Sequence, residues 1–371
     1  MNQCTSSIFT DIIIKQLSIG SPHMVDSFAS GNLILMITII AAIFASVTTT
    51  LVLVPRIMKK MKERGFTGID WNKKDKTEIP ELGGIAILFG FPIGISIATG
   101  MWKLFGPGFS ATPILAAIGV LFIAGMIGII DGISGIPQRV KAVVLAFAAL
   151  PLIIAGIGSA VIDLPFGIEI NLAGTEELRL IFWMIIVPIA ITGAANAMNM
   201  SAGYNGLESG QIAIISLSLL VLIVLQNGSI EAGLIFAALF GAAVGLNYYN
   251  GYPAVTFVGD VGTLSMGAVI GASAIIGSVE FASVIAISPA FFEGFSTAYY
   301  SFVKKINRKA ACAAPIIDEE GKLHAPKGAE KYTLGYWILS KKPMTERNLV
   351  RTILGIYAVS GLLAILFSGL M

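Results

Sequence analysis

Residues 112–130 read T-P-I-L-A-A-I-G-V-L-F-I-A-G-M-I-G-I-I, a run without a single charged side chain. A helix needs about 20 apolar residues to cross a hydrocarbon core about 30 Å thick. A strand pattern would alternate, and an open strand would leave backbone groups unpaired in lipid. We therefore predict that this run is a transmembrane helix.

The rest of the chain has the same character. Of its 371 residues, 56% are hydrophobic and 12% are charged, whereas about 25% are charged in soluble domains. Further apolar runs, bounded by charges, Gly or Pro, predict an all-α polytopic integral membrane protein of about ten helices forming a single transmembrane domain over 1–371. The predicted spans lie near 31–54, 83–100, 112–130, 141–157, 180–198, 210–226, 231–249, 263–280, 283–302 and 351–369.

The distribution of Lys and Arg predicts the orientation, because cytoplasmic loops carry the excess of positive charge. With ten spans, all but three of the 24 Lys and Arg residues fall in alternate loops or at their borders; the exceptions are Lys15, Lys103 and Arg179. Both termini then face away from the cytoplasm, so residues 1–30 form an extracytoplasmic segment. The cytoplasmic loops are 55–82, 131–141, 199–209, 248–262 and the large loop 303–350 before the last helix. The net charge of +2 gives no reason to expect a nucleic-acid partner.

Two aspartates lie at predicted membrane edges. Asp260 precedes an apolar, Gly-rich span, and Asp131 follows the run quoted above. A carboxylate at that depth is costly unless it is paired or bound to a cation, which makes each a candidate functional residue. The alternative is that each merely caps a helix.

The same predicted face carries amides, an acid and lysines. Asn196 and Asn199 share a helical face, and Asn205 and Glu208 follow in a Gly-broken turn. Loop 55–82 adds four candidates: Asp70, Asn72, Lys73 and Glu81. Oxygen ligands of this kind suit Mg²⁺, or alternatively Mn²⁺, and lysines beside them suit a diphosphate. The pattern indicates phosphoryl transfer at a membrane surface, although basic loops also serve orientation and contact with membrane lipids.

Five segments, in the order in which they occur in the chain, carry a family resemblance: G-I-D-x-N-K, I-P-E-L-G-G, D-G-I-S-G-I-P-Q-R-V-K, N-A-M-N-M-S-A-G-Y-N-G-L-E-S-G-Q and F-V-G-D-V-G. Over roughly residues 30–310 the chain resembles the polyprenyl-phosphate N-acetylhexosamine-1-phosphate transferases. The branch it most resembles is the eukaryotic and archaeal enzymes that attach GlcNAc-1-phosphate to dolichyl phosphate. The resemblance implies transfer of a sugar phosphate from a UDP-N-acetylhexosamine to a polyprenyl phosphate, with Mg²⁺ required and UMP released. This is a first membrane step of glycan assembly such as N-glycosylation, and we expect a prokaryotic, most readily archaeal, plasma membrane.

The resemblance also implies roles for individual residues. Asp260 and Asn199 would bind the metal, and Lys141 would contact the diphosphate. The remaining implied roles concern the two substrates: Phe257 and Gly203 sandwich uracil, Asn205 hydrogen-bonds it, Glu81 lies at the sugar end and Asp131 faces the lipid phosphate. We also expect Asp70, Asn72 and Lys73 to bind substrate.

The chain departs from the family pattern at two places. Gly132 stands where a second aspartate is expected, and Gly135 where an acid or amide follows. A general base or covalent nucleophile at that second acid is therefore not expected, and the lipid phosphate, mostly dianionic near pH 7, can attack directly in line. In loop 303–350 the family's Arg/His-rich signature is missing, and Arg308 and Lys309 are our substitutes for it.

Two other functions fit part of the pattern. A transporter or flippase of lipid-linked sugars would also use charges in the membrane, but at mid-span rather than at one face. An intramembrane aspartyl protease would need G-x-G-D, and position 257 is Phe. The identity of the hexosamine, the length and saturation of the lipid, and the oligomeric state, a homodimer included, stay open.

Overall fold

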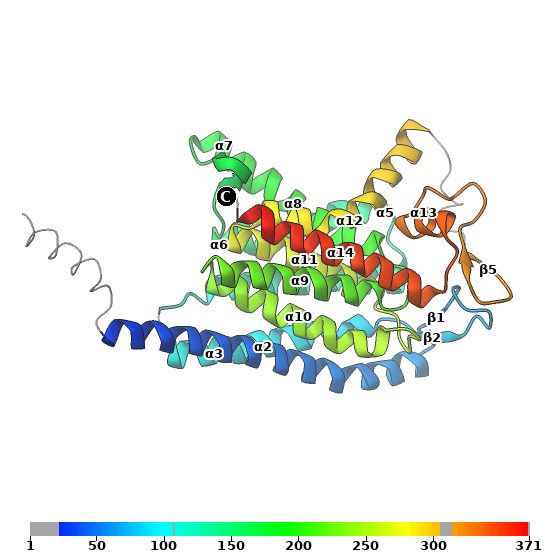
Figure 1. Cartoon of the computed structure of the whole chain (residues 1–371), viewed down its shortest axis with the longest axis horizontal. Coiled ribbons are helices and arrows are strands. Elements are labelled where there is room, and N and C mark those ends of the chain that lie inside the picture. Colours follow the sequence, from blue (N-terminus) through cyan, green and yellow to red (C-terminus); the bar gives the residue numbers. More distant parts are fainter. Residues whose placement is uncertain (1–21, 107, 305–313, 370–371) are drawn as a thin grey trace, which may run out of the picture.

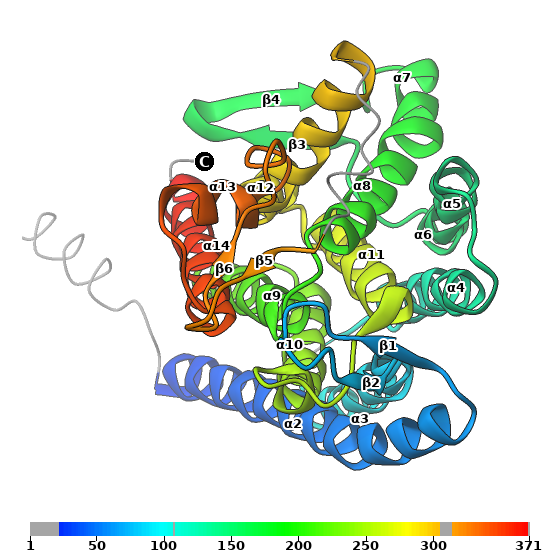
Figure 2. The same ribbon diagram turned by 90° about the vertical axis from the view of Figure 1, so that its right-hand side faces the viewer.

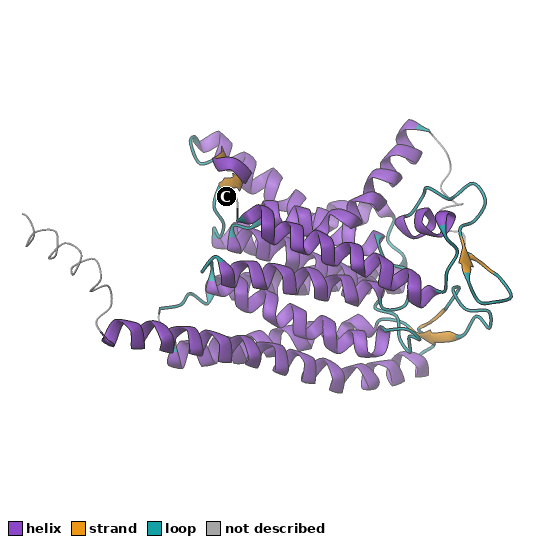
Figure 3. Ribbon diagram, viewed as in Figure 1, coloured by secondary structure: helices purple, strands orange, loops and turns teal. Residues whose placement is uncertain are grey.

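The computed structural model describes residues 22–106, 108–304 and 314–369. In this part of the chain, eight helices are long and apolar enough to cross a membrane, and they lie side by side (Figures 1 and 3). These are α2 (Pro22–Glu63), η1 (Gly83–Ala86) with α3 (Ile87–Phe105), α4 (Thr112–Ser134), α7 (Glu176–Ile181) with η4 (Phe182–Ile186) and α8 (Val187–Met200), α9 (Leu207–Leu225), α10 (Ile230–Asn250), α11 (Gly259–Gly277) and α14 (Glu346–Ser368). The prediction of an all-α polytopic membrane protein is confirmed.

The two other predicted spans are also helical but less regular. The span near 141–157 is composed of α5 (Gln138–Leu145), η2 (Ala146–Ala149) and α6 (Leu150–Ala155), of which Val140–Ala155 is a shorter apolar helix. The span near 283–302 corresponds to α12 (Glu280–Ala298) and η5 (Tyr299–Val303). Helices therefore occupy all ten predicted positions.

Helix α2 is much longer than the predicted span 31–54. It runs for 42 residues, or about 63 Å, which is roughly twice the thickness of the hydrocarbon core. Lys and Arg are good helix formers, so the basic residues after position 55 end the apolar run without ending the helix.

Three small antiparallel hairpins connect the helices. Strands β1 (Thr67–Ile69) and β2 (Glu78–Pro80) pair with Gly68 opposite Ile79. The other pairs are β3 (Val161–Leu164) with β4 (Ile168–Asn171), joined by η3 (Pro165–Gly167), and β5 (Ile316–Ile317) with β6 (Leu323–His324), which precedes α13 (Leu334–Lys341). Figure 1 places β1, β2, β5 and α13 at one end of the bundle, hereafter the loop end, and α7 at the other.

Helix α11 is the centre of the bundle (Figure 2). Every residue from Val261 to Ile275 is buried, and the helix packs against α4, α8 and α10. Small residues make this packing close: a Cβ on Gly128 of α4 would lie 2.5 Å from the Cα of Val261, and one on Gly84 would lie 2.5 Å from the Cα of Gly262. Glycine at helix contacts is how helices approach closely in lipid. The first turn of α11 is thereby held firmly at the loop end.

Candidate active site

Main-chain hydrogen bonds fix the start of α11. The N–H of Phe257 donates to the carbonyl of Pro80 (2.9 Å), and the N–H of Gly83 donates back to the carbonyl of Phe257 (2.9 Å). The N–H of Gly84 donates to the carbonyl of Val258 (3.0 Å). Gly259 then turns the chain into α11 with φ +68°, a left-handed conformation that favours glycine. Loop 55–82 and loop 248–262 are thus joined, and Asp260 lies in the first turn of α11.

Four polar side chains meet at this point, and we call them the lysine cluster: Asp131, Lys141, Asn199 and Asp260. Lys141 Nζ lies 2.6 Å from Asp131 Oδ2 and 2.8 Å from Asp260 Oδ2. The lysine side chain is only 2% exposed, and those of Asp131 and Asp260 are 8% and 32% exposed. Asn199 Nδ2 donates to Asp260 Oδ1 over 2.7 Å. Residues of the predicted loop 131–141 and of α8 therefore converge on Asp260.

Both carboxylate oxygens of Asp131 are engaged. Oδ1 accepts the N–H of Ile136 (2.6 Å), and Oδ2 accepts from Lys141. Gly135 ends α4 with φ +68°, so the chain turns back and brings Lys141 to the carboxylate. At the position of the family's second acid, a Cβ on Gly132 would lie 2.9 Å from Leu82 Cδ2. A side chain at position 132 would therefore have to displace only the end of Leu82, and Asp131 holds Lys141 in place.

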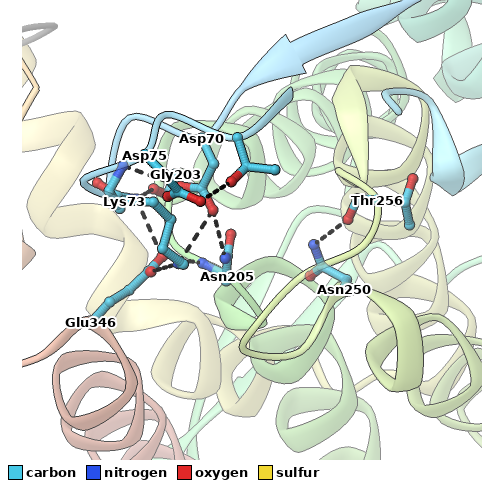
Figure 4. A network of polar contacts seen from close by, with 10 residues as sticks. Asp70, Lys73, Asp75, Gly203, Asn205, Asn250, Thr256 and Glu346 are labelled. Atoms are coloured by element: carbon cyan, nitrogen blue, oxygen red, sulfur yellow. Dashed lines mark hydrogen bonds and ion pairs between the residues drawn. The ribbon is translucent and has the colours of Figure 1, made fainter. Parts of the chain in front are cut away.

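A second group, hereafter the orienting network, consists of Asp70, Lys73, Asn205 and Glu346 (Figure 4). Asn205 donates its backbone N–H to Glu346 Oε1 (2.8 Å) and its side-chain Nδ2 to Asp70 Oδ2 (2.9 Å). Lys73 Nζ pairs with Glu346 and with Asp70 Oδ2, the latter over 3.2 Å. Burial acts to lower the pKa of Lys73, but the interactions with Glu346 and Asp70 outweigh it and raise that pKa.

Asn72 adds a link to the same region. Its Nδ2 donates to the carbonyl of Gly203 over 2.8 Å. The N–H of Gly203 in turn donates to the carboxylate of Glu208 over 3.1 Å. Loop 55–82, the turn after α8 and the start of α14 are therefore tied together at the loop end.

A cavity of about 1120 Å³ opens between these groups. Its wall contains Asn199 of the lysine cluster, Asp70 and Asn205 of the orienting network, and the predicted uracil contacts Gly203 and Phe257. A Cβ on Gly203 would meet no atom within 4 Å, so there is open space beside this glycine. Tyrosines add to the wall, at positions 204, 336 and 357.

Glu81 is not among the residues that line the cavity. Glu81 directs its carboxylate against the backbone of Gly68, which also lies close to the ring of Phe257. Arg308 and Lys309 lie outside the described residues. The roles implied for all these residues stay predictions, but the structure brings the metal and diphosphate candidates into one cluster and the uracil candidates to the wall of one cavity.

Two contributors were not anticipated from the sequence. Glu346 contacts residues far away in the chain and starts α14, where an acid is ordinary, so no local signal marks it. Thr263 Oγ1 accepts a hydrogen bond from Asn199 Nδ2 over 2.8 Å. It lies one helical turn after Asp260, and that spacing was the one signal that could have marked it.

Comparison with known proteins now decides the family. A protein of Sulfolobus acidocaldarius, provisionally named a UDP-N-acetylglucosamine–dolichyl-phosphate N-acetylglucosaminephosphotransferase, is 31% identical over 338 residues, which are 90% of this chain and 98% of that protein. Residues 114–278 match the model of glycosyl transferase family 4. The chain belongs to this family.

Two more relatives widen the comparison. A protein of Saccharolobus solfataricus with the same provisional name is 32% identical over 339 residues, 90% of this chain and 97% of that protein. A Bacillus subtilis protein, provisionally named an undecaprenyl-phosphate N-acetylglucosaminyl 1-phosphate transferase, is 26% identical over 287 residues, 76% of this chain and 75% of that protein. The family predicted from the motifs is confirmed. None of these three relatives is named as a transporter or a protease.

Proposed function

We propose that this family 4 member transfers GlcNAc-1-phosphate from UDP-GlcNAc to a polyprenyl phosphate such as dolichyl phosphate and releases UMP. The observation that carries the proposal is the position of Asn199, which belongs both to the lysine cluster and to the cavity wall. A nucleotide base beside Asn205 and Phe257 would leave its phosphates next to Asp260 and Lys141. The names of the archaeal relatives support the choice of sugar and lipid.

The cavity has the size that this substrate needs. Pockets for drug-sized ligands measure about 300–1,000 Å³, and this one measures about 1120 Å³. A space of this size is large enough for a nucleoside diphosphate sugar. A long lipid chain would not need to enter it, because Ile130 and Ile133 of α4, on either side of Asp131, are exposed and would face the membrane.

The donor set of the lysine cluster fits Mg²⁺. Within the described residues no group of three His, Cys, Asp or Glu side chains could hold a metal by itself. Asp260 and Asn199 supply a carboxylate and an amide oxygen, and Mg²⁺ is commonly bound by one or two protein oxygens together with substrate phosphates. Asn199 commits its Nδ2 to Asp260 and Thr263, which leaves Oδ1 as its free ligand atom. When bound there, the ion would neutralise charge on the diphosphate.

The chain's own residues act mainly by position and charge. In the transfer, an oxygen of the dianionic lipid phosphate forms a bond to the sugar-bearing phosphorus, and the bond from that phosphorus to the UMP oxygen breaks. Lys141 offsets negative charge on the phosphate oxygens, as its ammonium group is held between two acids. Asp131 has both oxygens engaged and keeps this lysine in place. No protein group has to take a proton, because the attacking phosphate carries none at its nucleophilic oxygen.

The orientation follows from the charge pattern. The loop end contains the positively charged loops, so we place it in the cytoplasm, where UDP-sugars are made, and the protein in a plasma membrane of archaeal type. Labelling with a membrane-impermeant reagent in intact cells tests this, with single cysteines introduced at Lys74 or at Lys103 of a chain whose native Cys4 and Cys312 are replaced by serine. Only position 103 should react.

Transfer itself is tested with purified protein, Mg²⁺, labelled UDP-GlcNAc and a polyprenyl phosphate. We expect a lipid-linked sugar diphosphate and an equal amount of UMP, and loss of both after chelation of Mg²⁺. Absence of UMP with every polyprenyl phosphate tried would remove the proposed function. Passage of an intact lipid-linked sugar across vesicles without UMP release would instead support the flippase alternative.

A further inference from the structure

Asp70 was expected to bind substrate, but the protein uses its carboxylate internally. Oδ1 accepts the N–H of Asn72 (3.1 Å), and Oδ2 accepts from Asn205 Nδ2 (2.9 Å) and lies 3.2 Å from Lys73 Nζ. The residue is 4% exposed. Its two oxygens hold protein groups, so Asp70 can act as a positioning residue for Asn205.

The contact with Asp70 determines which way the amide of Asn205 faces. An ionised carboxylate accepts hydrogen bonds and cannot donate them, so only the NH₂ group of Asn205 can face it. Lys73 pairs with the same carboxylate over 3.2 Å. Glu346 accepts the backbone N–H of Asn205 and so fixes the main chain at the same residue. The amide is therefore held in one of its two orientations (Figure 4).

The other end of this amide is available to a ligand. Asn205 lines the cavity, and among the described residues nothing donates a hydrogen bond to its Oδ1. Gly203 leaves open space beside it, and Phe257 supplies an aromatic ring in the same wall. The cavity thus offers a fixed hydrogen-bond acceptor next to a place where a flat base can stack.

We infer that Asp70 determines base selection, by orienting Asn205 so that the cavity accepts the N3–H of uracil and rejects cytosine, whose N3 is itself an acceptor. The inference rests on the proposed function for the choice of a uridine nucleotide. Two acceptors facing each other in a buried site lose a hydrogen bond and gain none, which corresponds to about tenfold or more in affinity. Lys73 and Glu346 support the same orientation through their contacts with Asp70 and Asn205.

The test measures binding of UMP and of CMP to purified protein by calorimetry, without lipid acceptor. We expect the wild type to bind UMP about tenfold or more tightly than CMP. In Asp70→Asn the new amide can donate or accept, so Asn205 can face either way, and the ratio should fall to within about threefold. Asp75→Asn is the matched control, since Asp75 is an exposed acid in the same loop whose one partner within the described part of the chain is Thr77; it should keep the wild-type ratio.

A double variant separates orientation from mere structural support. Combining Asp70→Asn with Asn205→Asp reverses the pair, so that position 205 is again an acceptor only and the preference for UMP should return. A structural role alone would not restore it. Preservation of the ratio in folded Asp70→Asn, or no recovery in the folded double variant, would overturn the inference.

The wild type provides a measurement that does not depend on any variant folding. UMP methylated at N3 lacks the donor and should bind about tenfold or more weakly than UMP; equal binding would overturn the inference. Because no transfer is involved, these results are distinct from the test of the proposed function. If the protein prefers UMP but releases none from UDP-GlcNAc, the inference about base selection stands and the proposed transferase activity does not.

Discussion

Replacement of Lys141 by methionine tests the lysine cluster most directly, because methionine keeps much of the side chain's length and removes its charge. The ammonium group lies 2.6 Å from Asp131 and 2.8 Å from Asp260, and the side chain is 2% exposed. Removing one partner of a buried ion pair costs about 3–5 kcal/mol, because it leaves an uncompensated charge. Asp260 is about a third exposed, so water screens part of its interaction with Lys141. We therefore expect the free energy of unfolding to fall by about 3 kcal/mol, the lower end of this range.

The same variant should lose most of its activity. Loss of one preorganised group that stabilises developing charge lowers kcat by about 10²–10³. The rate of UMP release measures kcat, and unfolding in detergent measures the stability. Adding Asp131→Asn to Lys141→Met removes one unpaired carboxylate, so it should recover part of the stability and none of the activity.

The matched control is Lys103→Met. Lys103 is exposed and lies in the last turn of α3, at the end of this helix away from the loop end. Its stability should stay within about 0.5 kcal/mol of the wild type. If Lys141→Met unfolded like the wild type, or kept more than about a tenth of the wild-type kcat, the ion pairs would not hold the site as the geometry indicates.

Three further substitutions have distinct outcomes. Asp260→Asn should abolish UMP release at an unchanged melting temperature, since Lys141 keeps its pair with Asp131; a variant with substantial turnover would remove Asp260 from the proposed metal site. Asp131→Asn should lower kcat by more than about tenfold by loosening Lys141, and turnover near the wild-type rate would show that this acid is not needed to hold Lys141 in place. Gly128→Ala places a Cβ 2.5 Å from the Cα of Val261 and should cost about 1–3 kcal/mol in an unfolding assay, whereas Gly100→Ala, which meets nothing within 4 Å, should cost nothing.

Positions of the helices were predictable because lipid selects for apolar composition over a fixed length. Their ends were not, as α2 shows: its charged last turns remain helical after the apolar run has ended. The eight helices that satisfy the length and composition of a span all coincide with predicted spans.

The site was partly predictable from the sequence for a similar reason. Asp131, Asn199 and Asp260 stand out because polar groups at a membrane edge are rare and costly, and the structure places them together. Glu346 gave no such signal, because its partners Lys73 and Asn205 become neighbours only through the tertiary fold. Asp70 was recognised as important, but whether it faces substrate or protein depends on contacts that no local pattern encodes. Arg308 and Lys309 lie outside the described residues and stay predictions.

The attachment of Phe257 has a consequence for how the cavity wall can change over evolution. Its position is set by its own N–H and carbonyl, bonded to Pro80 and Gly83, and not by its ring. Other aromatic or aliphatic side chains can therefore be substituted there while Asp260, three residues later, keeps its place. Within one ancestral scaffold, this part of the cavity wall is free to diversify while the position of Asp260 is inherited unchanged.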